Sequence, residues 1–219
     1  MRFPEELDQV PEVWWHGDGV KRGLDVGLAV LGLVLSSPLW ALIALAIKLE
    51  DGGPIFYRQD RVGRGGGVFQ VLKFRSMVAN AEEVMGPVQA SRQDPRVTRI
   101  GEILRATALD ELPQLWSILR GHMGFVGPRA LRPGEIEVDG DGECVPLEAI
   151  PGYAERHVVR PGLTGLAQVY APRDIPRLQK FRYDLLYIRR RNLWLDLRLI
   201  GLSLWISVRG RWGHRKRKF

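Results

Sequence analysis

The chain has 219 residues, of which 45% are hydrophobic and 26% charged, so it can bury a core and is not a disordered chain. The formal net charge of +7 predicts an anionic partner, and nucleic acid, an anionic membrane surface and a phosphate-bearing substrate all fit it. The single cysteine, Cys144, excludes a disulfide within the chain and a cysteine-rich zinc site, and it fits a reducing compartment.

Residues 1–20 mix charges with prolines and lack the basic-then-apolar order of a signal peptide, so we expect an irregular lead-in. Residues 26–47 then contain no charged side chain. As a straight helix, these roughly 22 residues would extend ~33 Å, which is enough to cross a bilayer.

The charges around this apolar stretch argue against a simple span. Lys21 and Arg22 precede it, and Lys48 follows it. Positively charged residues are retained on the cytoplasmic side of a membrane, yet a simple span would place one of these two groups outside.

Pro38 lies near the middle of the stretch. It lacks an N–H and its ring clashes with the carbonyl of Val34, so a helix is expected to bend or break there. The hydroxyls of Ser36 and Ser37 can bond the carbonyl groups that the proline frees. From these residues alone, a kinked spanning helix and a re-entrant helix that returns to the same face both remain open.

A β-hairpin is expected next. Residues 55–59 and 68–74 are rich in β-prone side chains, and the GRGGG between them is typical of a turn. No Gly-Lys-Ser/Thr follows these glycines, which argues against the phosphate-binding loop of nucleotide triphosphatases.

Residues 99–121 contain two helical stretches. In the second, four side chains recur at helical spacing and predict a buried face: Leu112, Leu115, Trp116 and Leu119.

Two further helices are expected toward the C-terminus. Residues 177–191 form a basic amphipathic helix, and Asn192 is expected to cap a helix over residues 193–208. Trp194 and Trp205 suit a helix at a membrane interface. The tail RGRWGHRKRKF predicts an anchor to anionic membrane lipids.

The strongest candidate for chemistry is the pair Asp110 and Glu111, in ATALDELPQLW. Taken alone, acidic side chains at the start of a helix are explained by capping and by the helix dipole. Basic residues recur in the motifs nearby, several of them in turns: Lys73, Arg75, Arg105, Arg129 and Arg160.

Carboxylates among such cations indicate a metal ion with phosphates, because carboxylates hold Mg²⁺ while Arg and Lys neutralise phosphate oxygens. A carboxylate can also attack phosphorus directly. We therefore expect these five basic residues to bind substrate phosphate, although a structural ion pair is the alternative for any one of them.

Five motifs, in order, resemble those of a known family: KRGLDVGLAVLGLVLSSPLW, PIFYRQDRVG, FQVLKFRSM, LDELPQLWSILRGHMGFVGPRAL and RPGLTGLAQV. The family is the bacterial sugar transferases, the monotopic polyprenyl-phosphate phosphoglycosyl transferases that begin exopolysaccharide, O-antigen or glycoprotein glycan assembly. The resemblance runs from about Lys21 to the C-terminal helix.

The resemblance implies that a nucleotide-diphosphate sugar, in particular a UDP-sugar, gives its sugar-1-phosphate to undecaprenyl phosphate. By the match of the DE pair, Asp110 is the nucleophile that forms a phosphosugar–enzyme intermediate, and Glu111 associates with Mg²⁺. The SP of the apolar stretch matches the re-entrant break of the family, at Ser37 and Pro38. The family is found on the cytoplasmic face of the bacterial inner membrane.

We therefore expect an α+β protein with four segments: a lead-in (1–20), a re-entrant membrane helix (21–49), a small, mainly helical catalytic domain with a β-hairpin (50–190), and an interfacial amphipathic helix with a polybasic tail (191–219). Two positions depart from the family pattern. His122 stands where the family usually has aspartate, which puts metal preference in doubt, and Ala130 stands where proline is common.

The competing hypotheses are a membrane-tethered nucleic-acid binder and a non-catalytic membrane scaffold. Neither explains the DE pair or the basic residues placed in turns, so we expect no nucleic-acid partner. The sequence does not identify the sugar, the nucleotide base or the pathway, and it leaves the oligomeric state open, a homodimer included.

Overall fold

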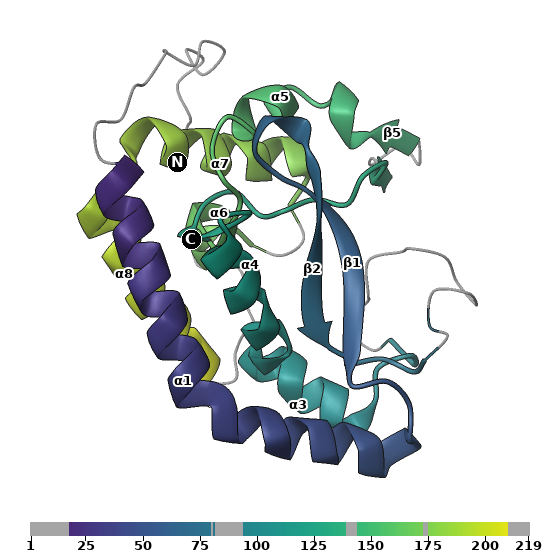
Figure 1. Ribbon diagram of the computed structural model, residues 1–219. Helices are drawn as coiled ribbons and strands as arrows, with labels where there is room; N and C mark the ends of the chain where they lie inside the picture. Colours follow the sequence, from purple (N-terminus) through teal and green to yellow (C-terminus); the bar gives the residue numbers. More distant parts are fainter. Residues whose placement is uncertain (1–17, 80, 82–93, 139–143, 173–174, 210–219) are drawn as a thin grey trace.

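A computed structural model describes residues 18–79, 81, 94–138, 144–172 and 175–209 (Figure 1). In chain order the elements, with η for 3₁₀-helices, are α1 Asp18–Asp51, β1 Phe56–Val62, η2 Arg64–Gly66, β2 Val68–Phe74, α3 Arg99–Thr107, η3 Leu109–Gln114, α4 Leu115–Arg120, β3 Gly124–Val126, β4 Ile136–Val138, β5 Cys144–Pro146, η4 Leu147–Ala149, α5 Tyr153–Arg156, β6 Gly162–Thr164, α6 Leu166–Tyr170, α7 Arg177–Arg190 and α8 Leu193–Val208. Helices dominate, and the strands form small two-stranded sheets, which confirms the mixed helix and strand class.

Helix α1 is continuous through Pro38, and it is bent: it runs down one side of the molecule and then turns beneath α3 (Figure 1). The hydroxyl of Ser37 donates to the carbonyl of Val34 at 2.8 Å, which is the group that the proline leaves without a partner. The indole of Trp40 donates to the Ser36 hydroxyl at 3.0 Å. The expected break is thus a bend within one helix, because these side chains support it where the backbone bond is lost.

The first turns of α1 are tied to the rest of the protein. The guanidinium of Arg22 donates to the last carbonyls of α4, those of Ile118 at 2.6 Å and Leu119 at 2.8 Å. Lys21 forms an ion pair with the buried Asp196 of α8.

The last turn of α1 is tied to the same body. The carboxylate of Glu50 accepts the free N–H of Arg99 at 2.7 Å, which satisfies an unpaired donor at the start of α3. Asp51 pairs with Arg75 at the end of β2. Ile43 and Ile47 are buried in the apolar cluster beneath the hairpin.

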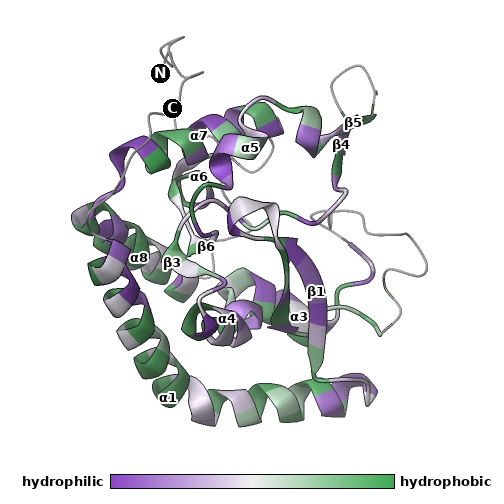
Figure 2. Ribbon diagram, turned by 45° about the horizontal axis from the view of Figure 1, so that its top comes forward, coloured by the Kyte–Doolittle hydropathy of each residue, from purple (hydrophilic) through white to green (hydrophobic). Residues whose placement is uncertain are grey.

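Between these two attachments α1 is apolar and exposed. Its middle is hydrophobic and both of its ends are hydrophilic (Figure 2). Val30, Val34, Leu35, Leu42 and Leu45 are exposed. Within the described residues, α1 is also the helix whose length and composition are sufficient to cross a membrane.

Strands β1 and β2 pair antiparallel from Phe56 with Phe74 to Val62 with Val68, so the predicted hairpin is confirmed, with a first strand that extends further than expected. One expectation is wrong. Trp116 is 46% exposed and lies beneath the guanidinium of Arg120, because α4 begins only at Leu115 and a 3₁₀-helix of different pitch precedes it.

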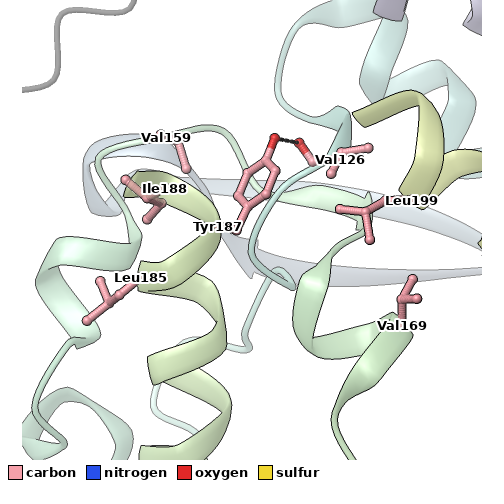
Figure 3. Close-up of a cluster of buried hydrophobic side chains, with 7 residues drawn as sticks. All are labelled: Val126, Val159, Val169, Leu185, Tyr187, Ile188 and Leu199. Carbon is pink, nitrogen blue, oxygen red and sulfur yellow. Dashed lines mark hydrogen bonds between the residues drawn. The ribbon is translucent and has the colours of Figure 1, made fainter. Parts of the chain in front are cut away.

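The capping role predicted for Asn192 is confirmed, since its side chain accepts the N–H of Leu195 at 2.9 Å. Helices α7 and α8 pack their apolar faces around Leu185, Ile188 and Leu199 (Figure 3). The polybasic tail, beyond residue 209, lies outside the described residues.

Candidate active site

Asp110 and Glu111 lie on η3, in the short link between α3 and α4. Ala108 ends α3 in the left-handed conformation (φ 58°), which redirects the chain before the pair. Both carboxylates lie in the first turn of η3, and its N-cap residue, Ala108, forms no side-chain cap hydrogen bond. Neither Asp110 nor Glu111 occupies the N-cap position, so a role beyond capping depends on the groups that surround them.

Glu111 is paired with two cations from separate elements. The ammonium of Lys73, on β2, lies 2.6 Å from Glu111 Oε1, and the guanidinium of Arg129 lies 3.7 Å from the same oxygen. Burial alone would raise the pKa of Glu111, but Lys73 and Arg129 outweigh it and lower that pKa below its ordinary value.

Asp110 is in a different electrostatic state. Burial raises its pKa, and the adjacent negative charge of Glu111 adds to that effect, while Lys73 and Arg105 oppose it. Two adjacent carboxylates with pKa values pushed apart are typical of a pair with separate roles.

The segment that carries Arg129 is held by close backbone contacts. Strands β3 and β6 pair in parallel, and the N–H of Gly162 donates to the carbonyl of Pro128 at 2.9 Å. A Cβ on Gly127 would lie 2.4 Å from the carbonyl oxygen of Arg160, and one on Gly162 would lie 2.1 Å from the nitrogen of Gly127. Only glycine fits at either position.

Two buried arginines hold the carbonyls of this segment. Arg156 donates to the carbonyl of Arg129 at 2.6 Å, and Arg61 donates to the carbonyl of Ala130 at 2.8 Å. Arg156 is in turn paired with Asp184 of α7 at 2.9 Å. The Arg129 side chain thus reaches Glu111 from a backbone that is fixed on two sides.

Tyr187 of α7 holds strand β3, which directly precedes the segment that carries Arg129. The hydroxyl of Tyr187 lies 3.2 Å from the carbonyl oxygen of Val126 (Figure 3). The same hydroxyl lies 2.8 Å from Asp196 Oδ1. Asp196 is the residue that pairs with Lys21. One buried network therefore joins α7, α8, β3 and the start of α1.

A cleft of about 2460 Å³ contains the pair. Its polar wall includes Lys73, Arg105 and Arg129 beside the two carboxylates. Its apolar wall includes side chains of α1 and α8, among them Leu31 and Leu204. The arrangement can hold an anion next to an apolar group.

The remaining predicted phosphate-binding residues are placed differently. Arg75 borders the cleft, but it is buried and bound to Asp51 and to the carbonyl of Pro54. Arg160 donates to the carbonyl of Gly121 at 3.0 Å and is not among the residues that line the cleft. His122 is exposed against the ring of Phe69 and is likewise outside the lining.

Sequence reasoning missed the polar face of β1. Tyr57, Gln59 and Arg61 alternate along the strand and line the cleft, and Arg61 and Gln59 are hydrogen-bonded to each other. The run of polar residues YRQDR within PIFYRQDRVG was the signal that could have found them, because every second residue of a strand lies on the same face.

The described ranges contain no group of three or more His, Cys, Asp or Glu side chains that could form a complete metal site. The donors available at the pair are the carboxylate oxygens of Asp110 and Glu111. This set fits Mg²⁺, which is commonly held by one or two carboxylates together with substrate phosphates and water.

Comparison with known proteins gives a match over most of the chain. The model of a family described as Bacterial sugar transferase matches residues 16–210. The chain is 46% identical over 188 residues, 82% of its length, to a UDP-glucose:undecaprenyl-phosphate glucose-1-phosphate transferase of Caulobacter vibrioides, of which it covers 66%.

Two further relatives show the range of names. A UDP-N-acetylgalactosamine-undecaprenyl-phosphate N-acetylgalactosaminephosphotransferase of Aeromonas hydrophila is 41% identical over 83% of this chain, which covers 42% of that protein. The exopolysaccharide production protein PSS of Rhizobium leguminosarum bv. phaseoli is 40% identical over 83% of this chain, which covers 91% of that protein. The chain thus spans 42% to 66% of the two relatives named as transferases and most of the length of the third.

Proposed function

Because the chain belongs to the bacterial sugar transferase family, we propose that it transfers a sugar-1-phosphate from a UDP-sugar to undecaprenyl phosphate. The observation that carries the proposal is the Asp110–Glu111 pair, set among cations in a cleft whose other wall is apolar. The names of the Caulobacter and Aeromonas relatives state a UDP-sugar and undecaprenyl phosphate. They state different sugars, so the sugar of this protein is not assigned.

In the first step, a carboxylate oxygen of Asp110 attacks the β-phosphorus of the UDP-sugar. The bond between that phosphorus and the bridging oxygen breaks, and UMP leaves with the oxygen. Asp110 then carries the sugar-1-phosphate as an acyl phosphate. The ionised carboxylate is already nucleophilic, so the step needs no general base.

In the second step, a phosphate oxygen of undecaprenyl phosphate attacks the same phosphorus. The bond to Asp110 breaks, the carboxylate is regenerated, and the product is a polyprenyl diphosphate sugar. A double displacement suits two substrates of which one arrives from water and the other from lipid, since each can occupy the site in turn.

The surrounding groups offset charge. Lys73 and Arg129 lie within 3.7 Å of Glu111, close enough to interact with diphosphate oxygens bound beside the pair. Asp110 and Glu111 are the residues that would hold Mg²⁺. When bound, Mg²⁺ neutralises charge on the phosphates and lowers their repulsion of the nucleophile.

We place the protein on the cytoplasmic face of the bacterial inner membrane, with α1 re-entrant. Two observations support this: both ends of α1 are bound to the same body, and the side chains between them are apolar and exposed. A helix that crossed the membrane would separate its ends. Exposed Trp194 and Trp205 on α8 support an interfacial position for that helix.

The test is UMP release. Purified full-length chain is incubated with undecaprenyl phosphate, Mg²⁺ and a panel of UDP-sugars, and wild type is compared with Asp110→Asn. We expect turnover with at least one donor, its loss after chelation with EDTA, and a fall in the variant of about 10⁴-fold or more, since removal of a nucleophile costs that much in other enzymes.

The matched control is Asp60→Asn, the same change on an exposed position of β1 that points away from the cleft. It should keep wild-type turnover. Mass spectrometry of protein quenched with a UDP-sugar and no acceptor should find the sugar-phosphate adduct on Asp110. An adduct on another residue would overturn the assignment of the nucleophile, and silence across the whole panel would overturn the reaction.

A further inference from the structure

Helices α1 and α8 each present one face to the cleft. The cleft-lining residues of both helices follow the same spacing, with intervals of three, one and three positions: Leu28, Leu31, Gly32 and Leu35 on α1, and Ile200, Ser203, Leu204 and Ser207 on α8. This spacing places each set on a single stripe along its helix.

The two helices lie side by side (Figures 1 and 2). Lys21 joins the start of α1 to Asp196 in the first turn of α8, and Arg191 lies 3.9 Å from Asp18. The stripes therefore form the two walls of one groove, which we call the α1–α8 groove and define by the eight residues above.

The surface of the α1–α8 groove is mainly apolar. The hydroxyl of Ser203 is hydrogen-bonded to Thr164, so it is already satisfied within the protein. Gly32 allows a close approach, because a Cβ there would lie 3.0 Å from Leu115 Cδ1. Leu115 lines the same cleft.

The groove leads to the acidic pair. Leu112 directly follows Glu111, and both Leu112 and Leu115 border the cleft between the pair and α1. At the other end the groove is open, since Leu31 is 53%, Leu35 71% and Leu204 63% exposed. These exposed residues lie on the apolar stretch of α1 and on α8.

We propose that the α1–α8 groove binds the isoprenoid chain of the polyprenyl phosphate next to its phosphate. This inference rests on the function proposed above. The occupant must be apolar along the groove and anionic at its inner end, where Lys73 and Arg129 lie. A prenyl chain with a terminal phosphate has this order.

The size of the groove fits the first part of such a chain. From Leu28 to Leu35 the stripe extends about 10 Å along the helix axis. The remainder of a long prenyl chain would continue past Leu35 into the bilayer. The groove therefore binds the isoprene units closest to the phosphate and makes no contact with the far end of the prenyl chain.

The first experiment locates the chain directly and does not require turnover. Full-length protein in phospholipid nanodiscs is mixed with a polyprenyl phosphate that carries a diazirine in its first isoprene units, irradiated, digested and mapped by mass spectrometry. We expect adducts on groove residues such as Leu31, Leu35 and Leu204. Adducts confined to Val30, Val34 or Trp205, which point elsewhere on the same helices, would overturn the proposal.

The second experiment fills the groove. Leu31→Trp and Leu35→Trp are compared with Val30→Trp and Val34→Trp, which add the same bulk at exposed neighbours that do not line the cleft. In the groove variants we expect the KM for undecaprenyl phosphate to rise about tenfold or more, with the first step unchanged, as measured by the burst of UMP without acceptor. In the control variants both quantities should stay at wild-type values.

Failure of the groove proposal and failure of the proposed reaction give different results. Equal effects in the groove and control variants, or loss of the UMP burst in the groove variants alone, would overturn the groove. Absence of UMP release from the wild type would instead overturn the reaction, while the photo-adducts would still report whether a polyprenyl phosphate occupies the groove.

Discussion

Arg156 is the largest of the fully buried side chains in the described part of the chain, and its charge is balanced locally. Its guanidinium pairs with Asp184, donates to the carbonyl of Arg129, and lies 4.9 Å from the ring centroid of Phe181. A charge in the interior is tolerated only when it is paired and hydrogen-bonded. Here the pairing also fixes the backbone that carries Arg129.

The contacts of Arg156 predict that its effect on stability and its effect on activity can be measured separately. Asp184→Asn leaves the buried guanidinium without its counter-ion, which costs about 3–5 kcal/mol, and should lower the Tm by roughly 6–20 °C. The double variant Arg156→Met with Asp184→Leu replaces the pair by apolar side chains of similar size and should recover most of that loss.

The double variant should still turn over more slowly, because the carbonyl of Arg129 then loses its hydrogen bond from Arg156. Calorimetry gives the Tm, and UMP release gives kcat and KM. Wild-type kcat in the double variant would show that Arg156 serves stability alone.

At this scale the sequence was informative where the motif is local. The DE pair could be singled out, because adjacent acidic residues among basic ones can be seen in the sequence itself, and its catalytic role stays a prediction. The pairing of Arg156 with Asp184 was not, since the two residues are 28 positions apart and nothing in either neighbourhood predicts the other. For the same reason the bonds that Arg75 and Arg160 make to Asp51 and Gly121 were not foreseen.

Among the elements, α1 shows a competition between a local bias and tertiary contacts. Pro38 disfavours a straight helix by about 3 kcal/mol. Beyond the bend, Ile43 and Ile47 are buried against the hairpin and α3, and each such burial contributes about 1.5–3 kcal/mol. Asp51 adds its pairing with Arg75. The free energy that these contacts contribute to the bent form is thus at least as large as the free energy by which Pro38 disfavours a straight helix.

We therefore predict that Pro38→Ala alone leaves α1 bent. Spin labels at Gly19→Cys and Leu49→Cys, both exposed positions, in a Cys144→Ser background, report the end-to-end distance by pulsed electron paramagnetic resonance. A straight helix would separate these positions by about 45 Å. Wild type and Pro38→Ala should both give shorter distances.

Adding Asp51→Ala to Pro38→Ala should shift the distance between the two spin labels toward the value of a straight helix. The double variant lacks both the ion pair of Asp51 with Arg75 and the proline that disfavours a straight helix. A distance near 45 Å in Pro38→Ala alone would mean that the proline, and not the packing, holds the bend.

The other elements show which patterns predict structure reliably. The hairpin followed from strand periodicity and a glycine turn, and the Asn192 cap followed from one side chain beside a helix, both of which are local. The predicted buried face of the second helical stretch was wrong for Trp116, while Leu112, Leu115 and Leu119 do pack in one apolar cluster. The position of a side chain around a helix depends on where the helix begins, and η3 shifts the start of α4 to Leu115.

At the scale of the whole molecule, the two ends of α1 are joined by contacts that are remote in sequence. Lys21 pairs with a residue 175 positions away, and Glu50 accepts from one 49 positions away. Charge on both flanks left two topologies open, because flanking charge does not say which parts of the body each flank meets. The contacts favour a single side.

This predicts the outcome of a cysteine-labelling experiment on spheroplasts and inverted membrane vesicles. Single-cysteine chains with Gly19→Cys or Leu49→Cys, each in a Cys144→Ser background, are treated with a membrane-impermeant maleimide in spheroplasts and in inverted inner-membrane vesicles. The wild-type chain, whose Cys144 is exposed on the catalytic body, serves as the reference for the side of that body.

If both ends of α1 lie with the body, all three chains react in inverted vesicles and are protected in spheroplasts. A spanning α1 would make one of the two engineered positions react in spheroplasts while the other matches Cys144. In that case the bonds of Arg22 to α4 and of Glu50 to α3 could not exist together in the membrane. Helix α1 would then be attached to the catalytic body at one end only, and the cleft that contains the acidic pair would lose one of its two attachments to the membrane helix.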